Sequence, residues 1–277
     1  MDAPPEREDC RPFVKVAALM LEAGVHVPRV LEQDLEQGFL LLTDLGTRTY
    51  LDILNAGNAD GLFAGAIDAL VKWQAASKAD ILPPYDEALL RREIGLFPEW
   101  YIGRHKNIVL EPELEHALAQ VTDRLVACAL AQPRVYVHRD YMPRNLMESD
   151  PTPGVLDFQD AVYGPVTYDV VSLFRDAFIS WEEERVIDWA VRYWEKARRA
   201  GIPVQPDFGE FYRDFEWMGL QRHLKVLGIF ARINYRDGKP AYLRDTPRFL
   251  DYAQAVCGRY VELAPLKRVF ARIEAQG

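Results

Sequence analysis

The sequence predicts an α+β protein in which a small N-terminal lobe precedes a large helical C-terminal lobe. Three observations support this prediction. Runs of strand-forming residues occur only near the N-terminus and in two short segments in the middle of the chain. Apolar residues recur at helical spacing through most of the remainder, and glycine and proline separate the helical runs. We place the small lobe at residues 1–45 and the large lobe at residues 46–277.

The small lobe is predicted to contain one helix and two strands. The helix runs from Glu8 to Ala23, where apolar residues recur every three or four positions, and Gly24 ends it. The strands are expected at 28–31 and at 38–43. Because the second strand is apolar at almost every position, we expect it to be buried on both faces.

The large lobe is predicted to be helical except for a short insertion of two strands. Its first helices are predicted at 49–54, 60–77, 87–100 and 113–131. The two strands, Val135–Val137 and Val155–Leu156, flank a polar loop. The chain after Pro165 is predicted to be helical, with breaks at 201–203, 238–240 and Pro247.

The composition excludes several classes of protein. The 277 residues include 33 Lys and Arg and 42 Asp and Glu, which gives a formal charge of −9. Apolar residues make up 49% of the chain, as in ordinary globular proteins, and no apolar run is long enough to span a bilayer. A nucleic-acid surface requires clustered Lys and Arg, which a net acidic chain does not favour. We therefore expect neither nucleic acid nor a membrane as a partner.

The cysteines and the N-terminus predict a protein of the reducing cytoplasm. Cys10, Cys128 and Cys257 are far apart, so their spacing fits neither a disulfide framework nor a zinc site. Residues 1–6 are acidic and rich in proline, and the basic start and apolar run of a secretory signal are not present.

The central loop carries a motif with a chemical meaning. His138, Arg139, Asp140 and Asn145 match the pattern H-R-D-x-x-x-x-N, the catalytic-loop signature of protein kinases, at every fixed position. A chance match would occur about twice in a thousand chains of this length. Further on, an apolar pair is followed by Asp157-Phe158, where the metal-binding Asp-Phe-Gly of kinases would stand. The two pieces in this order indicate phosphoryl transfer.

Phosphoryl transfer explains why these residue types occur at this spacing. Asp140 would accept the proton of an attacking hydroxyl and orient it in line with the γ-phosphate. Asn145 offers a neutral amide oxygen and Asp157 a carboxylate, and both are oxygen ligands that suit Mg²⁺. Since the two metal ligands are expected on neighbouring strands, they can converge on one Mg-ATP.

On these motifs the chain resembles the aminoglycoside phosphotransferase/choline kinase family, a branch of the protein-kinase-like superfamily. Two further segments, 154–165 and 221–230, are similar to the members that phosphorylate N-acetylmuramate and N-acetylglucosamine at the anomeric hydroxyl in cell-wall recycling. The resemblance covers nearly the whole chain and implies a bilobal kinase-like fold, with ATP and Mg²⁺ as cofactors. It implies an amino sugar as the small-molecule substrate, while aminoglycosides, choline and homoserine, the acceptors of other members, stay open as alternatives.

The sequence departs from the kinase pattern in two places. Gln159 stands where protein kinases have the glycine of Asp-Phe-Gly, as is usual in this small-molecule branch. In addition, no glycine-rich hairpin precedes the helix near Glu8, and residues 1–5 resemble the end of the third strand of a kinase N-lobe. We therefore expect residues 1–45 to be a partial N-lobe of a longer protein. A coding segment for two or three strands upstream would support this expectation, and an immediate stop codon would exclude it.

Loss of the hairpin also leaves open a function of another class, that of a non-catalytic binding module. A chain without this phosphate-covering element could bind nucleotide or sugar and transfer nothing. The presence of Asp140, Asn145 and Asp157 argues against this non-catalytic alternative, because a pseudoenzyme usually loses one of the three.

Other residues are predicted to support the reaction. Thr43, Asp44 and Leu45 lie where the lobes should meet, and their backbone groups would recognise adenine. His138 is expected to orient the loop, and Asp169 to accept hydrogen bonds from backbone N–H groups of the catalytic loop. Arg139 is expected in a structural or substrate-facing ion pair, and Asp160 is expected to cap a turn rather than to bind a second metal ion.

A polar segment of a later helix is a candidate for the acceptor site. It contains Trp217, Gln221, Arg222 and His223, with Lys225 on the same stretch. An aromatic face with hydrogen-bonding side chains suits a sugar, and a cation suits the lactyl carboxylate of N-acetylmuramate. The alternative is an ordinary amphipathic helix with solvated charges.

Overall fold

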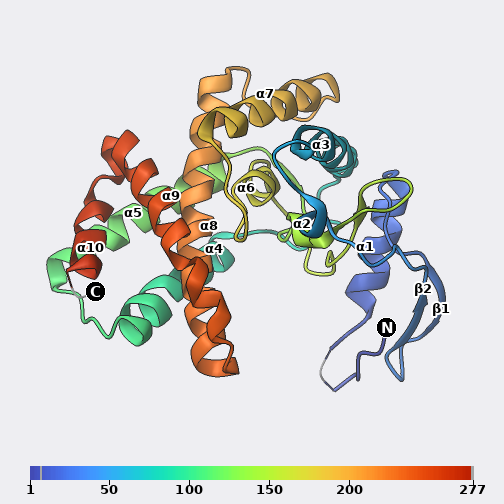
Figure 1. The fold of residues 1–277 in the computed structure, drawn as a ribbon, viewed down its shortest axis with the longest axis horizontal. Coiled ribbons are helices and arrows are strands. Elements are labelled where there is room, and N and C mark those ends of the chain that lie inside the picture. The colour runs from blue at the N-terminus through green and yellow to red at the C-terminus, as the bar shows by residue number, and fades with distance from the viewer. Residues whose placement is uncertain (7, 276–277) are drawn as a thin grey trace. The chain divides into compact units, whose positions relative to one another are not determined.

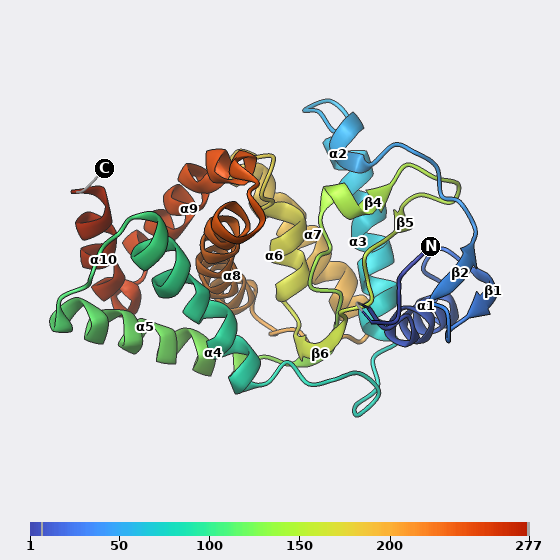
Figure 2. The same ribbon diagram turned by 90° about the horizontal axis from the view of Figure 1, so that it is seen from below.

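The computed structural model describes residues 1–6 and 8–275 of the chain (Figures 1 and 2). Two compact units are formed, one by Met1–Pro84 with Pro133–Phe211 and the other by Tyr85–Gln132 with the described part of Tyr212–Gly277. The expected lobe boundary at Leu45 lies inside the first unit, and the division into lobes stays a prediction.

The N-terminal part of the first unit contains a helix and a hairpin, as expected: α1 (Arg11–Glu22), β1 (Val30–Asp34) and β2 (Phe39–Leu42). In both views α1 lies beside the antiparallel pair of strands (Figures 1 and 2). Gly38, directly before β2, has φ +76°, and a Cβ there would be 2.0 Å from the backbone oxygen of Ala3, so the close approach of the N-terminal residues requires glycine.

The expectation that the second strand is buried on both faces is wrong. Leu40 is 3% exposed, but Phe39 and Leu41 are 48% and 58% exposed. The strand belongs to a two-stranded sheet, so only the face that holds Leu40 is covered. An apolar run therefore does not establish two-sided burial in this hairpin.

The rest of the first unit contains helices around an aromatic core. The helices are α2 (Tyr50–Ile53), α3 (Ala59–Ala75), α6 (Tyr168–Phe174) and α7 (Glu183–Arg199). Phe63 of α3 packs edge-to-face on Trp189 of α7, with ring centroids 4.5 Å apart. Thr49 and Asp52 form a reciprocal capping box that starts α2.

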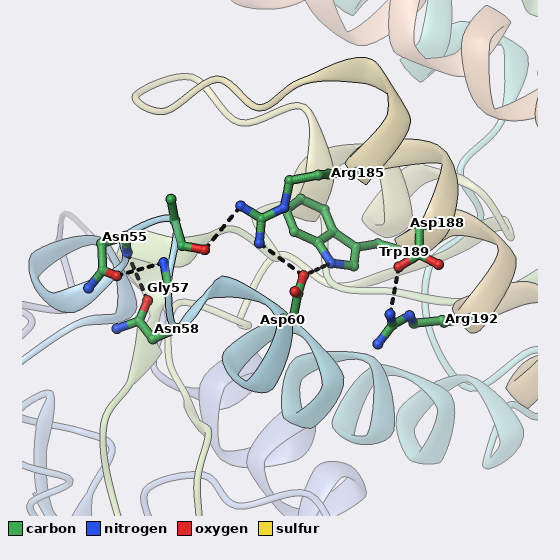
Figure 3. Close-up of polar contacts among 9 residues, drawn as sticks. Asn55, Gly57, Asn58, Asp60, Arg185, Asp188, Trp189 and Arg192 are labelled. Atoms are coloured by element: carbon green, nitrogen blue, oxygen red, sulfur yellow. Dashed lines mark hydrogen bonds and ion pairs between the residues drawn. The ribbon is translucent and has the colours of Figure 1, made fainter.

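A polar network ties the start of α3 to α7 (Figure 3). The Asp60 carboxylate accepts hydrogen bonds from Arg185 at 3.0 Å and from Trp189 Nε1 at 2.8 Å. Arg185 also donates to the backbone oxygen of Ala56 at 3.2 Å. These donors lower the pKa of Asp60, with the Arg185 hydrogen bond as the largest cause. The network fixes the loop before α3 with hydrogen bonds that a helical pattern in the sequence does not reveal.

Short strands hold the central loop. The strands are β3 (Arg134–Val137), β4 (Leu146–Met147), β5 (Gly154–Val155) and β6 (Val162–Pro165), with a 3₁₀ turn at Pro143–Asn145. β3 pairs with β6 and β4 with β5, both antiparallel. The two predicted strands are confirmed, whereas β4 and β6 were not expected. Their pairing places the loop after β3 beside the loop after β5.

The second unit is helical. Its elements are α4 (Glu87–Leu96), a π-helix at Phe97–His105, α5 (Pro112–Ala131), most of α8 (Phe208–Asp237), α9 (Thr246–Arg259) and α10 (Pro265–Glu274), with 3₁₀ turns at Pro240–Asp245 and Val261–Leu263. The helix predicted at 87–100 changes to a π-helix because Pro98 has no N–H to continue the α-helical ladder. Pro247 lies in the first turn of α9, where no such donor is needed.

Two helices of the second unit approach closely. A Cβ on Gly228 of α8 would be 2.3 Å from the backbone carbon of Leu96 at the end of α4, so only glycine fits there. In the described part of the chain, no helix has both the length and the apolar character needed to cross a bilayer.

Candidate active site

The catalytic loop begins directly after β3 and is held by Asp169. The two carboxylate oxygens of Asp169 accept hydrogen bonds from the backbone N–H groups of His138 at 2.7 Å and Arg139 at 3.0 Å. Asp169 is fully buried in the first turn of α6. Arg139 has φ +78°, a left-handed conformation that costs a non-glycine residue on the order of 1 kcal/mol. Asp169 therefore stabilises a backbone turn that would otherwise be unfavourable.

His138 connects the two loops of the site. Its Nδ1 accepts a hydrogen bond from the backbone N–H of Asp140 at 3.2 Å, and its Nε2 lies 3.0 Å from the backbone oxygen of Leu156. This pattern fits the neutral tautomer that carries its proton on Nε2. Burial lowers the pKa of His138 below its ordinary value of 6.5. Both ring nitrogens thus contact backbone groups of the two loops, so the ring positions the loop.

Asp140, Asn145 and Asp157 come together through hydrogen bonds. Asn145 Nδ2 donates to the backbone oxygen of Asp140 at 2.9 Å and to Asp157 Oδ2 at 3.2 Å. The Leu156 backbone N–H donates to the Asn145 backbone oxygen at 2.9 Å, which joins the two loops side by side. Asp157 has φ +63°, so its side chain leaves the strand end at a sharp turn. The three predicted residues form one polar cluster in the first unit.

One contact of this cluster was not expected from the sequence. Gln159 Nε2 donates to Asp157 Oδ1 at 3.0 Å. In the sequence, Gln159 differs from the kinase pattern because it replaces a glycine. That replacement introduces a hydrogen-bonding side chain next to Asp157, and it was the feature that could have indicated this contact. Its side chain orients the carboxylate, which a glycine in this position could not do.

The donor set fits a magnesium ion. Asp140 and Asp157 make no ion pair with any Lys or Arg in residues 1–6 and 8–275. Both amide hydrogens of Asn145 are engaged, which leaves its side-chain oxygen as the group available to a cation. No cluster of three or more His, Cys, Asp or Glu side chains able to hold a metal occurs in the described chain. A hard cation that takes further ligands from phosphate and water suits such a sparse oxygen site.

The predicted nucleotide-binding residues line a cavity of about 600 Å³ in the first unit. Thr43, Asp44 and Leu45 lie there with residues of the 24–27 and 149–151 loops. The backbone N–H of Thr43 donates to Arg29 at 3.0 Å, so it already serves the hairpin. Recognition of a base by the backbone of this segment would fall to Asp44 and Leu45.

The side chain of Arg139 contacts the backbone of Asp160. Arg139 Nη1 donates to the backbone oxygen of Asp160 at 3.4 Å, and the Asp160 side chain is exposed. The contact links the catalytic loop to the segment after Asp157. It gives Arg139 a structural partner near the site.

The four residues predicted for the acceptor lie in α8, in the second unit, and all are buried. Trp217 is 4% exposed, Arg222 is 2% exposed, and Gln221 and His223 are fully buried. The alternative of solvated charges on this helix is therefore wrong for Arg222. His223 stacks on Tyr252 with ring centroids 5.0 Å apart. Helical periodicity gave no sign of this burial, because α8 has polar residues on the faces that the other helices of the unit cover.

Comparisons with known proteins agree with these motifs. A sequence model of the phosphotransferase enzyme family matches residues 1–204. The N-acetylmuramate/N-acetylglucosamine kinase of Pseudomonas aeruginosa is 60% identical over 273 residues, which are 99% of this chain and 81% of that protein. The kinase of the same name from Neisseria meningitidis is 52% identical over 270 residues, 96% of this chain and 80% of its own.

Solved structures with little sequence likeness share the fold. A choline/ethanolamine kinase family protein from Mesorhizobium loti has a TM-score of 0.60 at 14% identity and covers 93% of this chain and 84% of its own. The aminoglycoside phosphotransferase APH(2'')-Ib, bound to ADP, has a TM-score of 0.59 at 14% identity, with 90% and 83% covered. These similarities confirm the predicted α+β, kinase-like fold.

Proposed function

Because the chain belongs to the phosphotransferase enzyme family, we propose that it transfers the γ-phosphate of ATP to a hydroxyl of an N-acetylated amino sugar. The favoured acceptor hydroxyl is the anomeric one of N-acetylmuramate or N-acetylglucosamine. The curated relatives at 52–60% identity bear the names of these two sugars, and they match almost the whole chain.

The cluster of Asp140, Asn145 and Asp157 carries this proposal. Asp140 acts as the general base, since its carboxylate has no cationic partner in the described chain and its backbone is fixed through His138. Asn145 and Asp157 hold Mg²⁺ through their side-chain oxygens. When bound, Mg-ATP supplies the phosphoryl group, and its metal ion neutralises charge on the phosphate oxygens.

Each supporting residue has its own task in this proposal. Asp169 and His138 keep Asp140 oriented, and Gln159 keeps Asp157 oriented. Asp44 and Leu45 contact the nucleotide base through their backbone, and Thr43 lines the same cavity. The α8 residues Trp217, Gln221, Arg222 and His223 bind the sugar.

The alternatives are less favoured. The likeness to aminoglycoside phosphotransferases and choline kinases is one of fold, at 13–16% identity. A polycationic aminoglycoside would also meet a buried guanidinium, that of Arg222, in the predicted acceptor segment. The non-catalytic alternative conflicts with the family membership of the chain and with its intact catalytic cluster.

The test is release of ADP from Mg-ATP with each acceptor offered separately. N-acetylmuramate, N-acetylglucosamine and an aminoglycoside are the acceptors, and NMR of the product locates the phosphate. We expect turnover with the amino sugars, phosphate at the anomeric carbon, and loss of turnover in Asp140→Asn. Asp188→Asn, which alters an exposed acid on α7, is the control. Turnover with the aminoglycoside alone would overturn the proposed acceptor class.

A further inference from the structure

Helix α8 contains two kinds of buried polar side chain. Glu216 is 1% exposed and is well partnered, since it accepts a hydrogen bond from Tyr260 at 2.7 Å and pairs with Arg259 at 2.8 Å. Lys225 is 8% exposed and pairs with Glu93 at 2.9 Å. These two charges are neutralised within the second unit.

Between them lie two side chains with buried polar atoms that have no partner in the described residues. Arg222 is 2% exposed, and its Nε and Nη1 atoms have no hydrogen-bond acceptor anywhere in residues 1–6 and 8–275. Gln221 is fully buried, and neither its amide nitrogen nor its amide oxygen has a partner in that part of the chain. Trp217, one helical turn before Gln221, likewise has a buried indole N–H with no acceptor there.

Such side chains are costly in a folded protein. A buried amide without hydrogen bonds costs about 1–3 kcal/mol, and a buried charge without a partner costs more. The same helix satisfies Glu216 and Lys225, so the second unit does supply partners where they are needed. The two orphaned side chains are adjacent in sequence on α8, and they supply a guanidinium and a primary amide.

We propose that Arg222 binds the carboxylate of an acidic amino sugar and that Gln221 binds its N-acetyl group. This inference rests on the proposed function and assigns the two substituents of the acceptor to two residues. A guanidinium pairs with a carboxylate through two parallel N–H···O bonds. A primary amide can both donate to and accept from an acetamido group, which has one N–H and one carbonyl oxygen.

This pairing explains how one chain could accept two sugars. N-acetylmuramate carries both a carboxylate and an N-acetyl group, whereas N-acetylglucosamine carries only the N-acetyl group. Arg222 therefore binds the carboxylate, which only N-acetylmuramate carries. Gln221 binds the N-acetyl group, which both sugars carry. An ammonium-rich sugar offers neither group and is repelled by Arg222.

The first variant is Arg222→Met, which removes the charge and keeps most of the side-chain length. We expect kcat/KM for N-acetylmuramate to fall about 100-fold, as for the loss of one partner of a buried ion pair. The value for N-acetylglucosamine should stay within about threefold. Arg236→Met is the matched control, because Arg236 lies on the same helix but is exposed and paired with Asp237.

The second variant is Gln221→Met, which removes the amide at nearly constant volume. We expect kcat/KM to fall about tenfold or more for both sugars, since both carry the N-acetyl group. A loss confined to one of the two sugars would overturn the role assigned to Gln221.

Thermal melts, which do not depend on turnover, distinguish a role of Arg222 in sugar binding from a purely structural role. Without sugar, Arg222→Met should raise the melting temperature by about 2 °C, because a buried unpaired charge is replaced by an apolar side chain. N-acetylmuramate should stabilise the wild-type chain in the same melts and should no longer stabilise this variant. A structural role would instead lower the melting temperature and weaken both sugars equally, which would overturn the inference.

If Arg222→Met does not fold, Arg222→Lys tests the same carboxylate contact. Lysine retains the charge but cannot form the two-bond fork, so we expect a partial loss for N-acetylmuramate alone. Equal losses for both sugars would count against Arg222 as the carboxylate ligand. If wild type phosphorylates neither sugar, the proposed function fails; if it phosphorylates both and Arg222 variants do not discriminate, only this inference fails.

Discussion

The catalytic loop and the buried polar segment of α8 differ in how their side chains are satisfied. His138 and Asp169 are fully buried, and each makes hydrogen bonds with both of its polar ends. Gln221 and Arg222 are as deeply buried, yet their amide atoms and two guanidinium nitrogens have no partner in the described chain. The hydrogen bonds of the loop are complete within the chain, which is the preorganisation that our proposed function requires. The α8 segment, under our inference, is completed by the acceptor.

The largest effect that tests this contrast is the loss of Asp140. Asp140→Asn keeps the size of the side chain and removes the base, so we expect kcat to fall about 1000-fold with KM little changed. Steady-state release of ADP measures both constants. A fall of less than about tenfold would mean that Asp140 is not the base and would break the assignment of the loop as the chemical site.

The pair of Lys225 and Glu93 sharpens the contrast within α8. Lys225→Met leaves the buried Glu93 carboxylate without its ammonium partner, so we expect the free energy of unfolding to fall by about 3 kcal/mol. Arg222→Met is expected to act in the opposite direction. Urea unfolding of the two variants gives both values. The same sign in both would show that the two buried cations are equivalent and would remove the contrast.

Asp169 tests whether the loop depends on prior organisation. Asp169→Asn replaces one carboxylate oxygen with an NH₂ group that faces a backbone N–H, and we expect a loss of about 2 kcal/mol in unfolding free energy. The turnover number should fall as well, because the turn at Arg139 relaxes. Denaturant melts and ADP release report the two effects, with Asp188→Asn as the control. Full activity in a destabilised variant would mean that the hydrogen bonds of Asp169 stabilise the fold but are not needed for turnover.

The smallest expected effect is a pH dependence that arises from His138. Burial lowers the pKa of His138 below 6.5, so under acidic conditions the unfolded chain binds a proton that the folded chain does not. The contribution of this residue to stability is therefore lost as the pH falls below 6.5. Unfolding free energies between about pH 5 and 8 should show a flatter slope in His138→Gln than in wild type, by at most about 1.4 kcal/mol per pH unit. An unchanged slope would mean that His138 binds its proton equally in the folded and the unfolded chain, so that burial does not lower its pKa.

Much of the fold could be predicted from local patterns. The predicted helices that correspond to α1, α3 and α5 formed because their apolar residues follow a single helical period. The π-helix at Phe97–His105 could not be predicted from that period. Nor could the exposure of Phe39 and Leu41, since an apolar strand is covered only where another element lies against it.

The sequence by itself predicted the cluster of Asp140, Asn145 and Asp157. Asp140, Asn145 and Asp157 lie within one short segment, so the β-loop-β insertion brings them together through local turns and short-range pairing. The chemistry of each residue type then indicated its task.

Only the tertiary structure decided which charges of α8 are neutralised. Helical spacing treats Arg222 and Lys225 alike, as two cations on one polar stretch. The partner of Lys225 comes from α4, far away in the chain, while Arg222 is buried without one in the described residues. Burial and pairing arise from packing between distant segments, because the environment of a buried charge is set by neighbours that no local pattern specifies.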